Sequence, residues 1–161
     1  MVKEIQNIKN EKLICLDFDD CIIEYAKKVD GKWANNSPGE IFKKLVENCN
    51  KIDKFCAENG YKVFIISSWS CIINDDLTLK KDTYDRLMKE WFDVIQQMNI
   101  IGKDPFNDRI LAMEILLEND NEIVCIDDLD LSAHFEWSKN FCMINYINGI
   151  VAKNTCNIKI L

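Results

Sequence analysis

Short runs of apolar residues, each followed by polar ones, recur along the chain and predict buried strands. The runs are continuously apolar rather than alternating, which is typical of strands that are covered on both faces. A further segment near the end of the chain predicts an edge strand. These expected strands span residues 12–17, 61–66, 99–101, 122–126, 141–146 and 154–160.

Between these runs, apolar residues recur at spacings of three and four, which predicts helices that bury one face. The clearest helix begins at Ser37, where the sequence SPGE supplies an N-cap, a proline at the first helical position and a capping-box glutamate. It ends at Asn59-Gly60, a typical C-cap. Two more helices are expected, over 80–98 and 107–119. The buried stripe of the first helix is Ile41, Leu45, Cys49, Ile52 and Cys56.

The alternation of strands and helices predicts one α/β domain over residues 1–161, since this length is ordinary for a single domain. We expect a Rossmann-like, open and mostly parallel sheet with helices on both faces. One interruption is the segment 22–36, where Asp30-Gly31 predicts a hairpin of two short strands. Sheets of this kind place their ligand sites at the carboxyl ends of the strands, so polar residues there are candidates for chemistry.

Composition narrows the classes of protein that fit. No apolar stretch is long enough to span a bilayer and the N-terminus lacks the apolar core of a signal peptide, so we expect a soluble, cytoplasmic protein. The eight cysteines form no CxxC pair, and with a single histidine they show no zinc-ligand spacing; we expect eight reduced thiols. A net charge of −7 argues against tight binding of duplex nucleic acid, but not against recognition of a phosphate end.

Acidic or hydroxyl residues follow three of the predicted core strands. Because carboxylates that converge at one edge repel each other unless a cation joins them, the pattern predicts a metal site. Oxygen ligands without histidine or cysteine favour a hard cation, and Mg²⁺ is the cytoplasmic default. The residues in these clusters are Asp17, Asp19, Asp20, Ser67, Ser68, Asp127 and Asp128. The expected metal ligands are Asp17, Asp19, Asp127 and Asp128.

Such a cluster can hydrolyse a phosphate ester. One carboxylate can attack phosphorus and form an aspartyl-phosphate, while another, two residues further on, protonates the leaving oxygen and later activates water. A hydroxyl group and a cationic side chain would hold the other oxygens of the phosphoryl group.

The ordered motifs LDFDDC, FIISS and VCIDD resemble those of the haloacid dehalogenase (HAD) superfamily of phosphohydrolases. The resemblance implies that Asp17 is the nucleophile, Asp19 the general acid and base, and Ser67 a phosphate ligand. It also implies that Asp128 binds the metal, with Asp127 supporting it. Asp20 and Cys21 depart from the family pattern, which has glycine and then threonine or valine at these two positions.

The third motif of the family is a lysine. Lys103 in IGKDP and Arg109 in NDRI are both candidates for this phosphate-binding cation, and we favour Lys103. Neither interval between the motifs has room for a cap domain. The chain therefore resembles the small capless members related to RNA-repair phosphatase domains, and equally small 5′-nucleotidases. The expected partner is a phosphorylated small molecule or the phosphate end of a nucleic acid.

Two alternatives come from other classes of protein. A catalytically silent relative would only bind phosphorylated partners, although Asp17 and Asp19 are both retained. A signalling receiver domain also uses an acidic pair, a hydroxyl group and a lysine around Mg²⁺. In a receiver, however, the acidic pair comes early in the chain, whereas here an acidic pair follows the hydroxyl residues.

Overall fold

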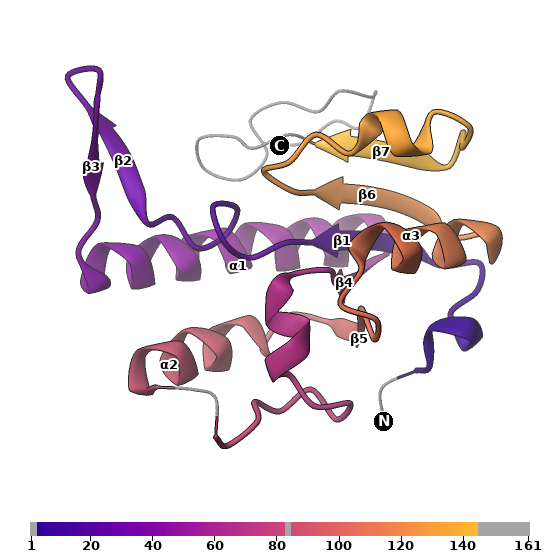
Figure 1. The fold of residues 1–161 in the computed structure, drawn as a ribbon, viewed down its shortest axis with the longest axis horizontal. Helices are drawn as coiled ribbons and strands as arrows, with labels where there is room; N and C mark the ends of the chain where they lie inside the picture. The colour runs from indigo at the N-terminus through magenta and orange to yellow at the C-terminus, as the bar shows by residue number, and fades with distance from the viewer. Residues whose placement is uncertain (1–2, 83–84, 145–161) are drawn as a thin grey trace.

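The computed structural model describes residues 3–82 and 85–144, which form a five-stranded sheet with helices against both faces (Figure 1). Neighbouring strands are parallel throughout, in the order β5-β4-β1-β6-β7. This confirms an α/β fold with an open parallel sheet, consistent with a Rossmann-like arrangement. The strands of the sheet are β1 (Lys12–Leu16), β4 (Tyr61–Ile65), β5 (Ile100–Lys103), β6 (Glu122–Ile126) and β7 (Phe141–Ile144).

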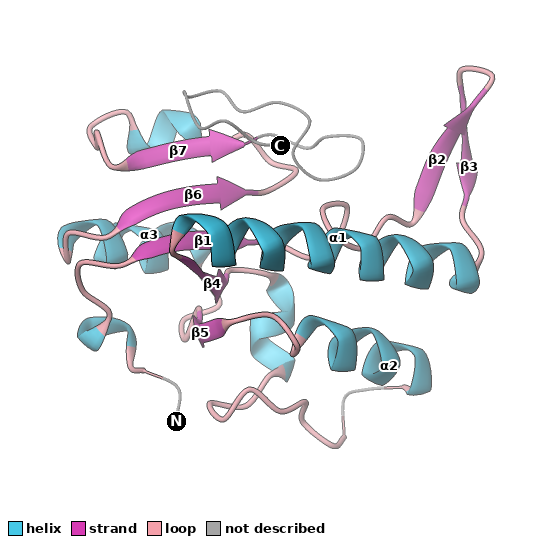
Figure 2. Cartoon of the chain, turned by 180° about the vertical axis from the view of Figure 1, so that it is seen from behind, coloured by secondary structure: helices cyan, strands magenta, loops and turns pink. Residues whose placement is uncertain are grey.

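Successive residues of each strand face two different cores, and this explains the continuously apolar runs. Ile14 and Leu16 of β1 pack on the side of helices α1 and α2, whereas Cys15 packs on the side of α3 and η1. Figure 2 shows α1 in front of the strands and α3 behind them. The helices are α1 (Pro38–Asn59), α2 (Arg86–Ile95) and α3 (Arg109–Glu118), with the 3-10 helices η1 (Ile5–Asn7), η2 (Ser68–Ile72) and η3 (Ser132–Phe135).

The helix boundaries follow from their capping residues. The first helix begins directly after Ser37, whose capping box is present as predicted. The helix expected over 80–98 is shorter, because Asp85 caps it and its first residue comes next. The helix expected over 107–119 also starts later, since Asp108 is its N-cap.

The predicted hairpin is present as β2 (Ala26–Val29) and β3 (Lys32–Asn35), paired antiparallel. Asp30 and Gly31 have φ angles of 50° and 79°. Positive φ at both central residues is what a two-residue type I′ turn requires. In Figure 1 the hairpin stands clear of the sheet, beyond the start of α1.

Two predictions about strands reach past the described residues. The last strand of the sheet covers 141–144 of the expected 141–146, and the edge strand expected over 154–160 also lies outside the described part of the chain. Among the helices that the structure describes, none has the length and apolar character needed to cross a membrane.

The cysteines differ in part from expectation. Cys142 is disulfide-bonded, so the prediction of eight reduced thiols is wrong at that position. The free thiols among the described residues are Cys15, Cys21, Cys49, Cys56, Cys71 and Cys125.

Candidate active site

The polar residues after β1 and β6 meet at the carboxyl edge of the sheet. The strand register sets Leu16 beside Ile65 of β4 and Ile126 of β6. Asp17 comes next, and its backbone N–H donates to the carbonyl of Ile126 at 2.9 Å. Asp127 follows Ile126, so the structure brings these two aspartates to the ends of adjacent strands.

One guanidinium nitrogen joins the two buried carboxylates. Nη1 of Arg109 donates to Oδ2 of Asp17 at 3.1 Å and also to Oδ2 of Asp127. The second oxygen of Asp17 accepts the backbone N–H of Phe18 at 2.8 Å. The second oxygen of Asp127 accepts the backbone N–H of Leu129 at 2.9 Å. Arg109 is the first residue of α3, so the start of that helix positions the cation.

Burial controls the charge of this trio. It raises the pKa of Asp17 to about 6, with Arg109 acting to lower the pKa and Asp127 to raise it. Burial also raises the pKa of Asp127, against the backbone N–H of Leu129 and the charge of Arg109. For Arg109, burial acts to lower the pKa, but the two carboxylates outweigh it and hold the pKa above its usual value. The nucleophile candidate is therefore mostly ionised at neutral pH and can be protonated just below it.

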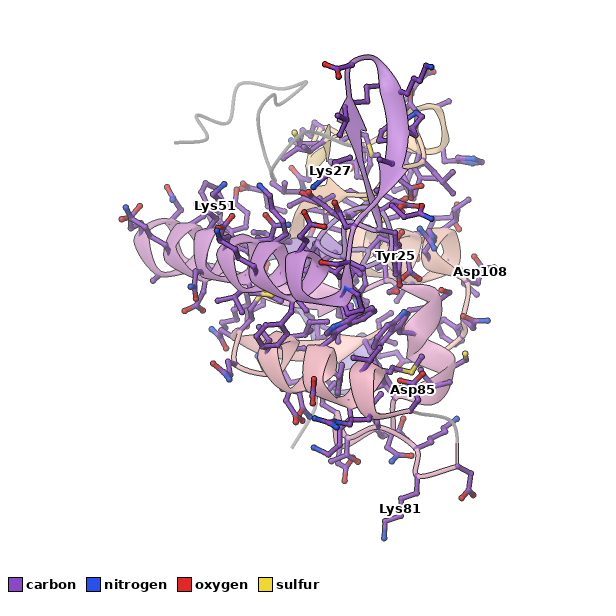
Figure 3. All side chains as sticks on the ribbon, turned by 90° about the vertical axis from the view of Figure 1, so that its left-hand side faces the viewer. Tyr25, Lys27, Lys51, Lys81, Asp85 and Asp108 are labelled. Carbon is purple, nitrogen blue, oxygen red and sulfur yellow. The ribbon has the colours of Figure 1, made fainter. Side chains whose placement is uncertain are left out.

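Both oxygens of Asp19 accept hydrogen bonds from aromatic side chains. The hydroxyl of Tyr25 donates to Oδ1 at 2.7 Å, and the indole Nε1 of Trp69 donates to Oδ2 at 3.2 Å. Trp69 is buried and packs edge-on against Phe18, with ring centroids 5.7 Å apart. Tyr25 lies at the base of the hairpin (Figure 3). The carboxylate of Asp19 is thus held in place from two elements that are distant in the sequence.

The sequence did not single out Tyr25. Trp69 follows the motif FIISS, a position that suits either a core residue or a wall of the site. Trp69 directly follows the expected phosphate loop, and this was the only signal available for it. Tyr25 carried no signal, because an aromatic residue beside a strand is ordinary. Its contact with Asp19 depends on how the chain folds back between β1 and the hairpin.

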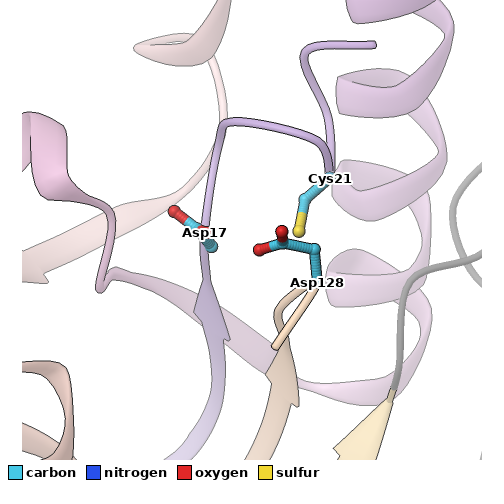
Figure 4. A group of neighbouring side chains, drawn as sticks. All are labelled: Asp17, Cys21 and Asp128. Atoms are coloured by element: carbon cyan, nitrogen blue, oxygen red, sulfur yellow. The ribbon is translucent and has the colours of Figure 1, made fainter. Parts of the chain in front are cut away.

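A second group at this edge contains Asp17, Cys21 and Asp128 (Figure 4). One ligand atom from each lies within 4.8 Å of the others. Burial raises the pKa of the Cys21 thiol, and the charges of Asp17, Asp127 and Asp128 raise it further. The thiol is therefore protonated, and the charged oxygen donors of the group are the two carboxylates.

Asp20 stands at the position where the HAD superfamily, which the motifs resemble, usually has glycine. Its φ is 57°, in the left-handed region that glycine enters most easily, and its N–H donates to the carbonyl of Ile23 at 3.0 Å. Aspartate tolerates this conformation better than most residues. Burial raises the pKa of Asp20, and the nearby charges of Asp128 and Asp19 add to that effect. The departure from the family pattern therefore keeps the turn and adds negative charge.

The donor set fits Mg²⁺. The carboxylates at this edge outnumber the single guanidinium that contacts them. Burial is the main cause of the raised pKa values of Asp17 and Asp20, and the charges of neighbouring carboxylates add to it. Asp17 and Asp128 offer hard oxygen ligands, and Mg²⁺ often binds through one or two carboxylates and keeps several waters. Asp17, Asp19 and Asp127 each accept hydrogen bonds on both oxygens, so hydrogen bonding does not single out the ligands. Asp17 and Asp128 are chosen because their oxygens lie within 4.8 Å of one another.

The other two candidates for phosphate binding lie differently. Ser67 is buried, and its hydroxyl oxygen accepts the N–H of Trp69 at 3.2 Å, which caps η2. Nζ of Lys103 lies 3.4 Å from the carbonyl oxygen of Ser70 and 3.6 Å from Oδ1 of Asp75. Of the two cations considered for the third motif, Arg109 is the one in contact with Asp17.

Searches of protein-family models, curated proteins and solved structures found no match to this chain. The arrangement supplies a buried carboxylate beside a guanidinium, a second carboxylate two residues further on, and a metal-compatible pair of carboxylates. These are the groups that phosphoryl transfer to a carboxylate needs.

The raised pKa of Asp17 predicts how stability varies with pH in the absence of divalent metal. A folded-state pKa of about 6, against an ordinary 3.8, means that the folded protein holds a proton that the unfolded chain releases. The free energy of unfolding should therefore fall as the pH rises through this window, by up to about 3 kcal/mol from this group. Urea unfolding should measure this effect as the difference in the free energy of unfolding between the wild type and Asp17→Asn. As the pH rises to about 6, that difference should change in favour of the variant, and above this pH it should stay constant. A difference that is constant throughout would contradict a raised pKa at Asp17.

Proposed function

We propose that this protein is a Mg²⁺-dependent phosphomonoester hydrolase that works through an aspartyl-phosphate on Asp17. The observation that carries the proposal is the contact of Asp17 with Arg109 at the carboxyl end of the central strand, with the fixed carboxylate of Asp19 two residues further on. The order of the motifs, which resembles the HAD superfamily, supports the same chemistry.

The first step is attack by a carboxylate oxygen of Asp17 on phosphorus. A bond forms between that oxygen and phosphorus, and the bond from phosphorus to the ester oxygen breaks. The leaving oxygen takes the electron pair of the broken bond and a proton from Asp19, so an alcohol departs. With a pKa of about 6, Asp17 is largely in the ionised form that this attack requires at neutral pH.

The second step regenerates Asp17. Asp19, now a carboxylate, accepts a proton from a water molecule as that water attacks phosphorus. The bond between phosphorus and Asp17 breaks, and inorganic phosphate leaves. The hydrogen bonds from Tyr25 and Trp69 hold the Asp19 carboxylate in one orientation, as both proton transfers require.

Arg109 and Ser67 are the groups proposed to hold the phosphoryl oxygens. The guanidinium already lies against Asp17, so it can balance the negative charge that accumulates as the oxygen–phosphorus bond forms. The hydroxyl oxygen of Ser67 accepts from a backbone N–H, which leaves its own hydrogen to donate to a phosphate oxygen. In this assignment Arg109 takes the role for which the sequence favoured Lys103.

Asp17 and Asp128 are the residues that would hold Mg²⁺. When bound, the ion supplies positive charge that offsets the repulsion between the phosphate group and the carboxylates. Asp127 supports the site indirectly, because it orients Arg109.

The proposed enzyme is small and has no separate cap domain. The interval after the first motif contains the hairpin and α1, and the next contains η2 and α2. Such a site would be open to a phosphorylated small molecule or to the phosphate end of a nucleic acid.

The proposal is tested by adding Mg²⁺. Hydrolysis of p-nitrophenyl phosphate should require the ion, and the ion should also raise the thermal unfolding midpoint because only the folded site binds it. At about a hundredfold excess over Kd, the gain in unfolding free energy is about 3 kcal/mol. Asp128→Asn should lose most of both effects. Asp130→Asn is the control, since this exposed aspartate bonds Ser132 instead. Equal stabilisation by Mg²⁺ of the wild type and the double variant Asp17→Asn, Asp128→Asn would refute the metal site.

A further inference from the structure

A pocket of about 460 Å³ lies at the carboxyl end of β5, on the same edge of the sheet as the proposed active site. It is lined by part of η2, by the segment after η2 and by the loop that follows β5. Its volume is within the range of small-molecule sites. The proposed hydrolysis uses none of its residues, although Lys103 lines it.

The side chain of Lys103 is largely buried, and its ammonium group has only weak partners. Its side chain is only 10% exposed, yet the nearest acceptors are the carbonyl oxygen of Ser70 at 3.4 Å and Oδ1 of Asp75 at 3.6 Å. The side chain of Asp75 is fully exposed, so this ion pair contributes little and is easily displaced. A buried ammonium with three donors normally has closer acceptors than these.

A second polar group in the pocket lacks a partner. Ser70 is 3% exposed, and within the part of the chain that the structure describes its hydroxyl oxygen has no hydrogen-bond partner. Leaving a buried hydroxyl unpaired is costly, so native structures rarely do so without a reason. Lys80 also lines the pocket, and its Nζ donates to the carbonyl of Cys71 at 2.6 Å. The pocket wall therefore carries two cations, and the unpaired hydroxyl oxygen of Ser70, which is one of the lining residues, is buried.

The pocket also contains acidic residues. Asp104 is buried and accepts the backbone N–H of Phe106 at 2.8 Å. Burial raises its pKa, while backbone N–H groups and the charge of Lys103 act to lower it. The exposed carboxylate of Asp75 pairs with the ammonium group of Lys103, where an anionic group of a ligand would bind. Release of Asp75 into solvent would expose the ammonium to that ligand.

The pocket also lies at a fixed place relative to the nucleophile. The register sets Leu16, Ile65 and Lys103 side by side across three adjacent strands. The backbones of Leu16 and Lys103 are two strand spacings apart, which is about 10 Å. The 3-10 helix η2 serves both places, because Trp69 bonds Asp19 while the next residue, Ser70, lines the pocket.

We infer that this pocket is a second anion subsite, formed by Lys103 and Ser70, for an acidic group on the leaving part of the substrate. The inference rests on the proposed hydrolysis at Asp17. It defines the substrate class: a phosphate ester whose leaving part carries a second phosphate or a carboxylate, long enough to reach between two strand ends whose backbones are about 10 Å apart. A simple monoester would leave the subsite unused.

Three substrates with the same alkyl chain test the inference: hexyl phosphate, the phosphate ester of ω-hydroxyhexanoate, and hexanediol bisphosphate. At least one of the two substrates with a second anion should have a KM about tenfold below that of hexyl phosphate, and the lower of the two identifies the preferred anion. Lys103→Gln and Ser70→Ala should each raise that KM towards the value for hexyl phosphate, with kcat unchanged. Neither variant should affect hexyl phosphate itself.

The matched control is Lys62→Gln. This lysine is partly buried and paired with Glu11, in the strand β4 but away from the carboxyl edge, so its loss should leave all three KM values unchanged. Equal KM values for the three substrates in the wild type would overturn the subsite. So would a KM advantage that survives in both Lys103→Gln and Ser70→Ala.

Binding of phosphonates, which cannot be hydrolysed, separates the subsite from the proposed reaction. By calorimetry, hexane bisphosphonate should bind the wild type about tenfold tighter than hexylphosphonate, and Lys103→Gln should remove the difference. If no phosphate ester is turned over but this dependence on Lys103 holds, the hydrolase proposal fails and the subsite stands. If turnover is normal and Lys103 makes no difference to binding, the subsite fails and the hydrolase stands.

Discussion

Asp17→Asn should abolish hydrolysis of phosphate esters while the protein stays folded. An amide cannot accept the phosphoryl group, so we expect a loss on the order of 10⁴-fold or more in kcat. The fold should survive because Asn has nearly the same shape and its amide oxygen can still accept one of the two hydrogen bonds, from the N–H of Phe18 or from the guanidinium of Arg109. The measurement is steady-state turnover of p-nitrophenyl phosphate, with circular dichroism to confirm folding.

Asp104→Asn is a suitable control for this experiment. Asp104 is as buried as Asp17, and its side chain also accepts a backbone N–H. Its replacement should change turnover of p-nitrophenyl phosphate little, because this substrate has no second anion. Beryllium fluoride, which mimics a phosphoryl group on a carboxylate, should stabilise the wild type and not Asp17→Asn. Turnover of Asp17→Asn within a few-fold of the wild type would rule out the mechanism, and no turnover by the wild type would favour a silent phospho-ligand binding module.

Asp19→Asn should damage alkyl phosphates far more than activated aryl phosphates. A general acid matters most when the departing oxygen is a poor leaving group, so we expect a loss of about 10²–10⁴-fold with an alkyl phosphate. With an aryl phosphate the first step should continue, but breakdown of the aspartyl-phosphate also needs the base. Rapid-mixing measurements should therefore show a burst of the aryl alcohol followed by slow turnover.

The surroundings of Asp19 make asparagine a well-matched replacement. The indole of Trp69 can only donate, so it would keep the amide oxygen, while the hydroxyl of Tyr25 can turn to accept from the amide nitrogen. Tyr25→Phe is the companion variant: it removes one positioning hydrogen bond and should cost much less than Asp19→Asn. An equal loss on both types of substrate without a burst would show that Asp19 is not the acid and base.

Much of the fold could be predicted from local patterns. Continuous apolar runs indicate strands covered on both faces, and the sheet has helices on each side. The start of α1 was evident from SPGE, because an N-cap acts through residues within one turn. The boundaries of α2 and α3 were less accurate, since the apolar spacing continues past the capping residues Asp85 and Asp108. The disulfide at Cys142 could not be inferred, because pairing depends on which segments fold together.

In the candidate site too, some features could be predicted from local sequence and others could not. Local patterns were enough to predict that Asp17 and Asp127 lie at the ends of strands, because strand ends are local features and parallel strands end at one edge. For the third-motif cation the sequence favoured Lys103 over Arg109, because sequence spacing does not tell towards which neighbours each side chain points. Only the tertiary structure set Arg109 against Asp17 and Lys103 in a separate pocket, and brought Tyr25 to Asp19. The physical reason is that a side chain's partners are fixed by the packing of the element that carries it, and that packing depends on residues far away in the chain.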